Sequence, residues 1–173
     1  MNIKMIATDA DDKEKEKVSV VLYEKKYHDD MLFCFLSAKD ALGIYAPDPQ
    51  WSKPALREDL LDIEKSYFER GDVFYLAIDK LDRVVGMVGT HSTSHTELWL
   101  KRLFVKPELK GKGVGSKLLF AVEEYAAGKG IIEIHTRFAY WYREAAAFYP
   151  AKGFVEVERN DYIIHMKKRL IGV

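Results

Sequence analysis

The sequence predicts an α/β fold in which helices flank a mixed β-sheet within a single domain. An apolar strand, a glycine-rich loop, an amphipathic helix and a further strand follow one another between residues 96 and 136, which is the order of a βαβ unit. One apolar hairpin precedes this unit and another ends the chain, so parallel and antiparallel strands are expected in one sheet. At 173 residues and 48% apolar composition, the chain fits one globular domain, 1–173, with its core at about 18–170.

The first quarter of the chain is expected to supply one strand and one helix. Residues 1–17 combine a segment compatible with a strand and a charged run of mixed sign, which is typical of a solvated turn. The β-branched run at 18–24 predicts a strand, and Asp29 or Asp30 is then placed to cap a helix that ends at Gly43. The apolar positions of this helix are Met31, Leu32, Phe35, Leu36 and Leu42.

A loop at 44–54 separates this helix from a second one, because the segment holds three of the five prolines. Ser52 is a candidate cap for the second helix, which is expected to end at Gly71. The apolar positions of the second helix are Leu56, Leu60, Ile63 and Tyr67. Tyr45 and Trp51 leave two interpretations open, since they either pin the loop to the core or line a substrate pocket.

The rest of the chain completes the sheet. A hairpin with nearly continuous apolar content is expected at 73–90, and strands of that kind are typically covered on both faces. The central strand is expected at 96–105. The later elements are a strand at 131–136, a helix at 142–149 and a hairpin that turns at Asn160 and Asp161. Pro150 predicts that the helix kinks or ends near Tyr149.

The composition excludes several classes of protein. With 27 basic and 27 acidic residues the formal net charge is zero, so nucleic acid is not the expected partner. Cys34 is the only cysteine and is expected to be a buried thiol, and the histidines lack further ligand candidates at suitable spacing, so no metal site is expected. No secretory signal pattern is present, and no apolar stretch approaches the roughly 20 residues that span a bilayer, so we expect a cytoplasmic protein without a membrane partner.

The glycine-rich loop carries the clearest functional signal. Gly111, Gly113 and Gly115 let the backbone turn sharply and present N–H groups to a ligand. A helix follows directly, and the unpaired N–H groups and dipole at its N-terminus favour negative charge. From 101 to 117 there are six Lys or Arg residues and one Glu, among them Lys110, Lys112 and Lys117. The loop is therefore a candidate phosphate site.

Three other interpretations of the loop are weaker. A dinucleotide-binding fold requires Gly-x-Gly-x-x-Gly close behind a strand, whereas this loop has Gly-x-Gly-x-Gly and five residues separate it from Val105. The acidic residue at a suitable distance, Glu133, lies inside an apolar run. A phosphate-binding P-loop is excluded because its spacing does not occur. The last interpretation is that the glycines only turn the chain into the helix.

Two motifs resemble those of the GNAT superfamily of acetyl-CoA-dependent N-acetyltransferases. KGKGVG after LKRLFVKPEL is similar to the family's acetyl-CoA signature, Arg/Gln-x-x-Gly-x-Gly/Ala, with Lys110 in the place of Arg or Gln. This substitution keeps the charge and loses the planar fork of donors. At the expected distance, AAAFYPAKGF at 145–154 resembles the family's Ala-x-x-Phe-Tyr-x-x-x-Gly-Phe. The resemblance covers most of the chain.

The resemblance implies a GNAT-like fold, with a twisted mixed sheet that splays near the glycine loop to admit the pantetheine arm of acetyl-CoA, the expected co-substrate. The backbone of Leu103, Phe104 and Val105 would pair with the pantetheine amides. The residues expected to hold the pyrophosphate are Lys110, Gly111, Lys112, Gly113, Val114, Gly115 and Ser116.

The resemblance also suggests catalytic residues. Tyr149 stands at the motif tyrosine that hydrogen-bonds the cofactor sulfur and is the candidate donor, and the alternative is a packed aromatic on a helix. Family members often carry a glutamate at the start of the strand before the loop, and Glu97 is the candidate base. Glu97 lies two residues before the family position, which Trp99 occupies, so an ordinary strand-end carboxylate is the alternative. Tyr142 replaces a common family asparagine.

Together these features predict an N-acetyltransferase that moves an acetyl group from acetyl-CoA directly to a primary amine of a small molecule or peptide. Direct transfer is expected because the only cysteine lies far in sequence from both motifs. The alternative is a non-catalytic acyl-CoA sensor or interaction module, which the residues at 99 and 142 allow. A homodimer is left open, and the sequence does not identify the acceptor.

Overall fold

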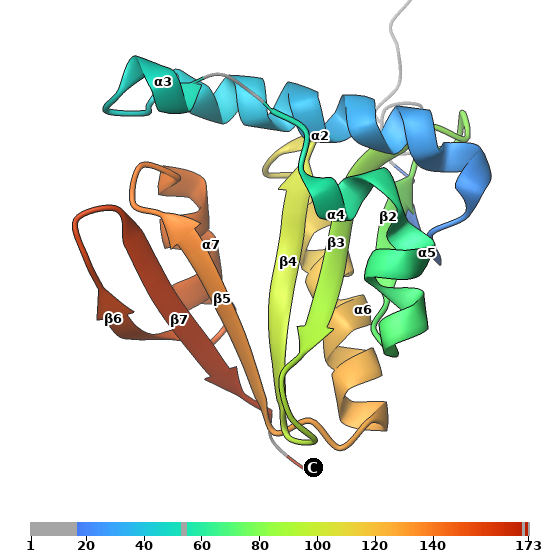
Figure 1. Ribbon diagram of the computed structural model, residues 1–173, viewed down its shortest axis with the longest axis vertical. Helices are drawn as coiled ribbons and strands as arrows, with labels where there is room; N and C mark the ends of the chain where they lie inside the picture. Colours follow the sequence, from blue (N-terminus) through green and yellow to red (C-terminus); the bar gives the residue numbers. More distant parts are fainter. Residues whose placement is uncertain (1–16, 53–54, 171, 173) are drawn as a thin grey trace, which may run out of the picture.

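The computed structural model describes residues 17–52, 55–170 and 172 (Figure 1). The strand and charged run expected within residues 1–17 lie outside the described residues, except for Lys17. The described chain forms one seven-stranded sheet in the order β1-β2-β3-β4-β5-β7-β6. The strands are β1 Ser19–Leu22, β2 Phe74–Ile78, β3 Val84–Ser92, β4 Glu97–Val105, β5 Glu133–Ala139, β6 Val155–Arg159 and β7 Ile163–Arg169. All neighbours are antiparallel except β4 and β5, so the predicted mixed sheet and its βαβ unit are confirmed.

The two parallel strands at the centre of the sheet, β4 and β5, are hydrogen-bonded to each other at one end only. β4 and β5 pair over Glu97–Trp99 and Glu133–His135, and then diverge. Figure 1 shows the result as two arms, one made of β1 to β4 and the other of β5, β7 and β6. Beyond Trp99, no described strand pairs with the β5-facing edge of β4. The splay that the family resemblance implied is present.

Helices cover both faces of the first arm. α2 (His28–Gly43) contacts β3 and β4, and α6 (Val114–Gly128) contacts β1 to β4 from the other side (Figure 1). Each helix has its own core: Met31 and Phe35 of α2 pack with Leu76 and Met87, whereas Leu118 and Val122 of α6 pack with Ala77, Val85 and Val88. β2 and β3 are buried along almost their whole length, which confirms the expected double cover.

The second predicted helix is wrong as a single element. The segment instead forms α4 (Glu58–Leu61), α5 (Ile63–Ser66) and the 3₁₀ turn η2 (Phe68–Arg70), and α3 (Pro49–Ser52) lies in the expected loop before it. Two other 3₁₀ turns, η1 (Lys25–Tyr27) and η3 (Pro107–Leu109), precede α2 and follow β4. Asp62 separates α4 from α5 because its backbone is extended, with φ −144°, and its carboxylate caps α5 by accepting from the Lys65 N–H. Ser52 is instead the last residue of α3, so its predicted place directly before a second helix was wrong. Gly71 does end the segment, at φ +80°.

The predicted start of α2 and the predicted end of α7 were both partly wrong. α2 begins at His28, so Asp29 and Asp30 lie in its first turn and do not precede it. The Asp30 carboxylate accepts a hydrogen bond from the Val84 N–H at 2.5 Å, which ties α2 to β3. α7 (Arg143–Ala151) continues one residue beyond Pro150, so the helix ends close to the predicted position. Across the described part of the chain, no helix combines the length and apolarity needed to cross a bilayer.

Candidate active site

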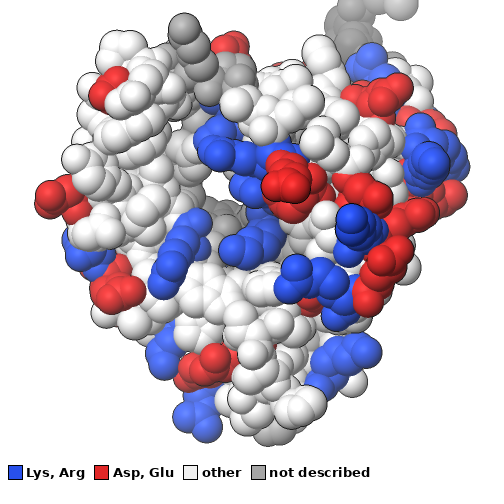
Figure 2. Space-filling view, viewed as in Figure 1, with Lys and Arg blue, Asp and Glu red and all other residues white. Residues whose placement is uncertain are grey.

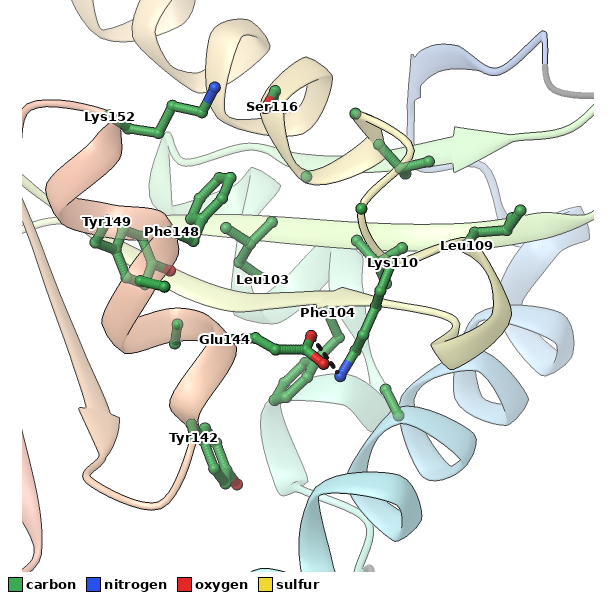
Figure 3. A pocket seen from close by; sticks show the side chains of 18 of the residues that line it. Leu103, Phe104, Leu109, Lys110, Ser116, Tyr142, Glu144, Phe148, Tyr149 and Lys152 are labelled. Atoms are coloured by element: carbon green, nitrogen blue, oxygen red, sulfur yellow. Dashed lines mark ion pairs between the residues drawn. The ribbon is translucent and has the colours of Figure 1, made fainter. Parts of the chain in front are cut away.

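A cavity lies where the splayed strand, the glycine loop and α7 meet (Figure 3). Its volume is about 780 Å³. Among the residues expected to bind the cofactor, all but Lys112 line it: Leu103, Phe104, Val105, Lys110, Gly111, Gly113, Val114, Gly115 and Ser116. Ala38 and Leu42 of α2 and Phe148, Tyr149 and Lys152 of the second motif complete the wall. The fold thus brings the two sequence motifs to one cavity.

The backbone of the glycine loop explains its composition. Gly111 and Gly113 have φ of +76° and +83°, a region that residues with a Cβ rarely adopt. A Cβ at either position would meet no atom within 4 Å, so the backbone conformation, not crowding, requires glycine there. Gly113 precedes α6 and has no side chain to cap it, which leaves the first N–H groups of α6 for a ligand in the cavity. These groups fit a pyrophosphate.

The lysines near the loop have different roles. The Lys110 ammonium lies 3.0 Å from a carboxylate oxygen of Glu144 on α7, so this ion pair spans the cavity (Figure 3). The Lys117 ammonium donates to the Val18 carbonyl at 2.9 Å and anchors the chain before β1. Lys152 also lines the cavity, and the sequence analysis did not select it although it lies inside the second motif. A phosphate in this cavity would therefore meet Lys110 and Lys152.

Strand β4 contains a bulge beyond the residues that pair with β5. Gly89 pairs with Lys101 and Met87 with Phe104, so two residues of β4 oppose one of β3. Arg102, in the bulge, has φ of +58°, which is uncommon for a residue with a side chain. Its guanidinium makes two hydrogen bonds to the Asp59 carboxylate, at 2.6 and 3.0 Å. This bidentate pair stabilises the strained backbone just before Leu103.

Asp59 is held in its charged form. Burial disfavours the Asp59 carboxylate, but hydrogen bonds from Arg102 and from the Tyr67 hydroxyl outweigh it and keep its pKa below the usual value. The Tyr67 hydroxyl donates at 2.5 Å to Oδ2 of Asp59, the same oxygen that accepts from Nε of Arg102. The bulge is therefore tied to α4 and to the residue after α5 by a charge-assisted network.

Tyr149 lies at the junction of the two cavities and lines both. It is only 6% exposed, its ring stacks on Phe138 at 5.5 Å between centroids, and its hydroxyl points toward the larger cavity in Figure 3. Burial raises the pKa of Tyr149 to about 12, against the effect of a hydrogen bond with Thr136. The phenol is therefore neutral at physiological pH and can act as a hydrogen-bond donor.

The second cavity, of about 660 Å³, lies on the other side of this junction. It shares Leu103, Phe104, Tyr142, Ala145 and Tyr149 with the first. Trp51 lines this cavity, which agrees with the interpretation that it lines a substrate pocket, whereas Tyr45 lines neither cavity. The Trp51 ring stacks on Trp141 at 5.5 Å and 5°. Sequence reasoning missed Trp141 because a long-range contact, and no local pattern, places it here.

Glu97 lies outside both cavities. It begins β4 at the paired end, opposite Glu133, and lies six positions before Leu103, about 20 Å along the strand at roughly 3.3 Å per position. Its role as the base stays a prediction, and no contact in either cavity supports it. Glu97 also lies with Glu133 and His135 in a group whose possible ligand atoms are within 4.8 Å of one another. Glu133 already accepts a hydrogen bond from Lys167 at 3.0 Å.

The fold and the two joined cavities define an acyltransferase domain. The chain belongs to the acetyltransferase (GNAT) family, whose model matches residues 38–154. It is 30% identical over 137 residues to N-acetyltransferase 8 of Homo sapiens, which covers 75% of this chain and 60% of that protein. It is also 30% identical over 127 residues to the probable N-acetyltransferase camello of Xenopus tropicalis, covering 71% and 58%. The matches thus span about three fifths of these relatives.

Solved structures confirm the predicted fold. The PaiA N-acetyltransferase of Thermoplasma acidophilum, in complex with coenzyme A, aligns with a TM-score of 0.79 at 17% identity. A GNAT-family acetyltransferase of Staphylococcus aureus Mu50 aligns with a TM-score of 0.76 at 22% identity. Each alignment covers 89% of this chain and 99% of the other chain.

Proposed function

We propose that this chain transfers an acetyl group from acetyl-CoA directly to a primary amine of a small molecule or peptide. The observation that carries the proposal is the meeting of two cavities at Tyr149, one lined by an uncapped helix N-terminus and the other by different elements. Two substrates that must exchange a group need such adjoining sites. The complex of PaiA with coenzyme A supports a CoA ligand for this fold.

The larger cavity offers matched partners for each part of acetyl-CoA. The loop and the first N–H groups of α6 would bind the pyrophosphate, with Lys110 and Lys152 adding positive charge. The unpaired edge of β4 at Leu103–Val105 would bind the pantetheine amides as an added strand does. The thioester would then lie near the bulge and Tyr149.

The transfer requires charge stabilisation at sulfur and at the carbonyl oxygen. The amine nitrogen forms a C–N bond to the acetyl carbonyl carbon as the C–S bond of acetyl-CoA breaks, and the electron pair leaves with sulfur. The nitrogen then loses one proton, and the thiolate gains one through solvent, so that the products are the amide and the CoA thiol. Tyr149 would donate a hydrogen bond to the departing sulfur. The bulge at Arg102 leaves a residue out of the β3–β4 ladder, and an N–H there could polarise the carbonyl.

Covalent catalysis by the chain's cysteine is disfavoured. Cys34 lies on α2 within the core and is fully buried. Burial raises its pKa to about 12, so the nucleophilic thiolate is scarce at neutral pH. Neither cavity includes Cys34. These observations support direct attack by the amine.

Binding and turnover test the proposal separately. Acetyl-CoA should raise the Tm more than NAD does, and a thiol reagent should detect CoA release when an acceptor amine is added. Greater stabilisation by NAD would contradict the cofactor assignment. Binding of acetyl-CoA without thiol release across amino acids, polyamines, aminoglycosides and peptide N-termini would favour the acyl-CoA sensor.

A further inference from the structure

The second cavity is strongly basic. Five cationic side chains line it, and among the described residues no Asp, Glu or His does; the five are Lys39, Arg57, Lys101, Arg102 and Arg137. Figure 2 is viewed from the same side as Figure 1 and shows blue Lys and Arg side chains around a hollow in the surface. A chain with zero formal net charge thus places five positive charges at this cavity.

Among the residues that the structure describes, carboxylates neutralise only part of this charge. Asp59 compensates Arg102, but Arg137 lies 3.9 Å from Glu158 with both side chains more than half exposed. Lys39 donates a hydrogen bond to the hydroxyl of Tyr142. Burial, and after it the charges of Arg102 and Arg137, lower the pKa of Lys101 against the raising effect of Asp59. An anion bound among these cations would relieve their repulsion.

The basic groups are held on an aromatic wall. The Arg137 guanidinium lies 4.7 Å from the centre of the Trp99 ring, and the Lys101 ammonium lies 6.0 Å from it. The Trp99 ring also stacks on His135 and His165, at 5.0 and 4.8 Å between centroids, and these two histidines are hydrogen-bonded to each other at 3.0 Å. Trp99, which replaces the glutamate expected at this position, is thereby fixed as a support for two cations.

We propose that the acceptor is an anionic amine, in which a carboxylate or phosphate near the amine is bound by Lys39, Lys101 and Arg137. The inference rests on the proposed function, because it assigns this cavity to the acceptor. Polyamines and aminoglycosides carry only positive charge and would be repelled by the same side chains. The neighbouring tryptophans favour an apolar or flat group beside the anion.

Matched pairs of amines isolate the anionic group. We would compare tyrosine with tyramine, tryptophan with tryptamine, lysine with cadaverine, and phosphoethanolamine with ethanolamine, correcting each kcat/KM for the fraction of free amine. The anionic member of a pair should be favoured about tenfold or more, as expected for hydrogen bonds to a charged group. The first three pairs report on carboxylate and the last on phosphate. Equal or better turnover of the plain amines would overturn the inference while leaving acetyl transfer established.

Variants link the preference to named residues. Arg137→Gln and Lys101→Gln should each lower kcat/KM for the anionic member about ten- to a hundredfold, with little change for the plain amine. Lys101→Glu should reverse the preference within a pair. Lys129→Gln, at an exposed position outside both cavities, is the matched control and should change neither rate. An unchanged preference in all three cavity variants would refute the assignment.

If no amine is turned over, binding measurements test whether the second cavity holds an anion site. Absence of thiol release from every pair would contradict the proposed function. The same pairs would then be titrated by calorimetry into the protein saturated with CoA. Tighter binding of the anionic members, lost in Arg137→Gln, would still support an anion site in this cavity. Tighter binding of the plain amines, or no binding of either, would overturn it.

Discussion

Replacing Tyr149 with Phe removes one hydroxyl and keeps the ring that stacks on Phe138. The main structural cost is the lost hydrogen bond with Thr136, about 1 kcal/mol of unfolding free energy. The fold and the affinity for acetyl-CoA should therefore survive. Any large change in rate would report on the chemistry at sulfur.

The magnitude follows from the pKa of Tyr149, which burial raises to about 12. Full proton transfer from this phenol to a thiolate with a conjugate acid near 8.5 is uphill by about 5 kcal/mol, from about 3.5 pK units at 1.36 kcal/mol each. Tyr149 is therefore expected to act by hydrogen bonding and to keep its proton. Loss of one such preorganised donor typically lowers kcat about 10²- to 10³-fold.

The assay is CoA release at saturating acetyl-CoA and acceptor, with single-turnover measurements to establish that chemistry limits the rate. Tyr140→Phe is the matched control, because Tyr140 is near in sequence but lines neither cavity. The wild-type pH profile should show no ionisation of Tyr149 below about pH 10. An unchanged kcat in Tyr149→Phe, with chemistry rate-limiting, would refute the role and leave the residue as a core aromatic.

Three further predictions concern the cofactor cavity and the bulge. Gly113→Asp should abolish stabilisation by acetyl-CoA, since it strains a backbone at φ +83° and places a carboxylate beside the pyrophosphate site; an unchanged Tm shift would count against that site. Glu144→Gln should tighten acetyl-CoA binding a few-fold by freeing Lys110, whereas Lys110→Gln should weaken it, as calorimetry would show. Asp59→Asn should lower stability by about 1–3 kcal/mol and reduce kcat by loosening the Arg102 bulge. The pKa of Asp59 is lower in the folded state than its unfolded value near 3.8. Its stabilisation is therefore present above pH 3.8 and is lost as the pH falls through the folded-state pKa. The denaturation curves of the wild type and of Asp59→Asn should thus converge at acid pH.

Much of the fold could be predicted because its signals are local. Glycines with positive φ, helical spacing after residue 113 and continuous apolar strands each depend on a few consecutive residues. The break at Asp62 was missed because the same apolar spacing continues through it, and only the extended backbone there shows that the helix ends. The separation of β4 from β5 was implied by family resemblance alone, since side-chain periodicity does not reveal where a strand loses its partner.

Some residues of the candidate site could also be predicted from local sequence, and others could not. The phosphate loop and Tyr149 belong to compact motifs, whereas Trp51, Arg137 and Trp141 come together only through the fold. Glu97 was chosen as a base by analogy with a sequence position, and that choice carried no information about distance from the reacting atoms. The sequence did show that Trp99 replaces the expected glutamate, but its packing under two cations required the structure.

The basic cavity also bears on how the acceptor loses its proton. An alkyl ammonium with a pKa near 10.4 requires about 4.6 kcal/mol to deprotonate at pH 7. One uncompensated cation about 6 Å from the nitrogen, at an effective dielectric constant of about 20, contributes about 2.8 kcal/mol, or about 2 pK units, toward the neutral amine. A bound carboxylate cancels one such charge, but Lys39, Lys101 and Arg137 together outnumber it. The same residues that select an anionic acceptor can therefore hold its amine in the nucleophilic form, and a cavity without a carboxylate base is consistent with catalysis.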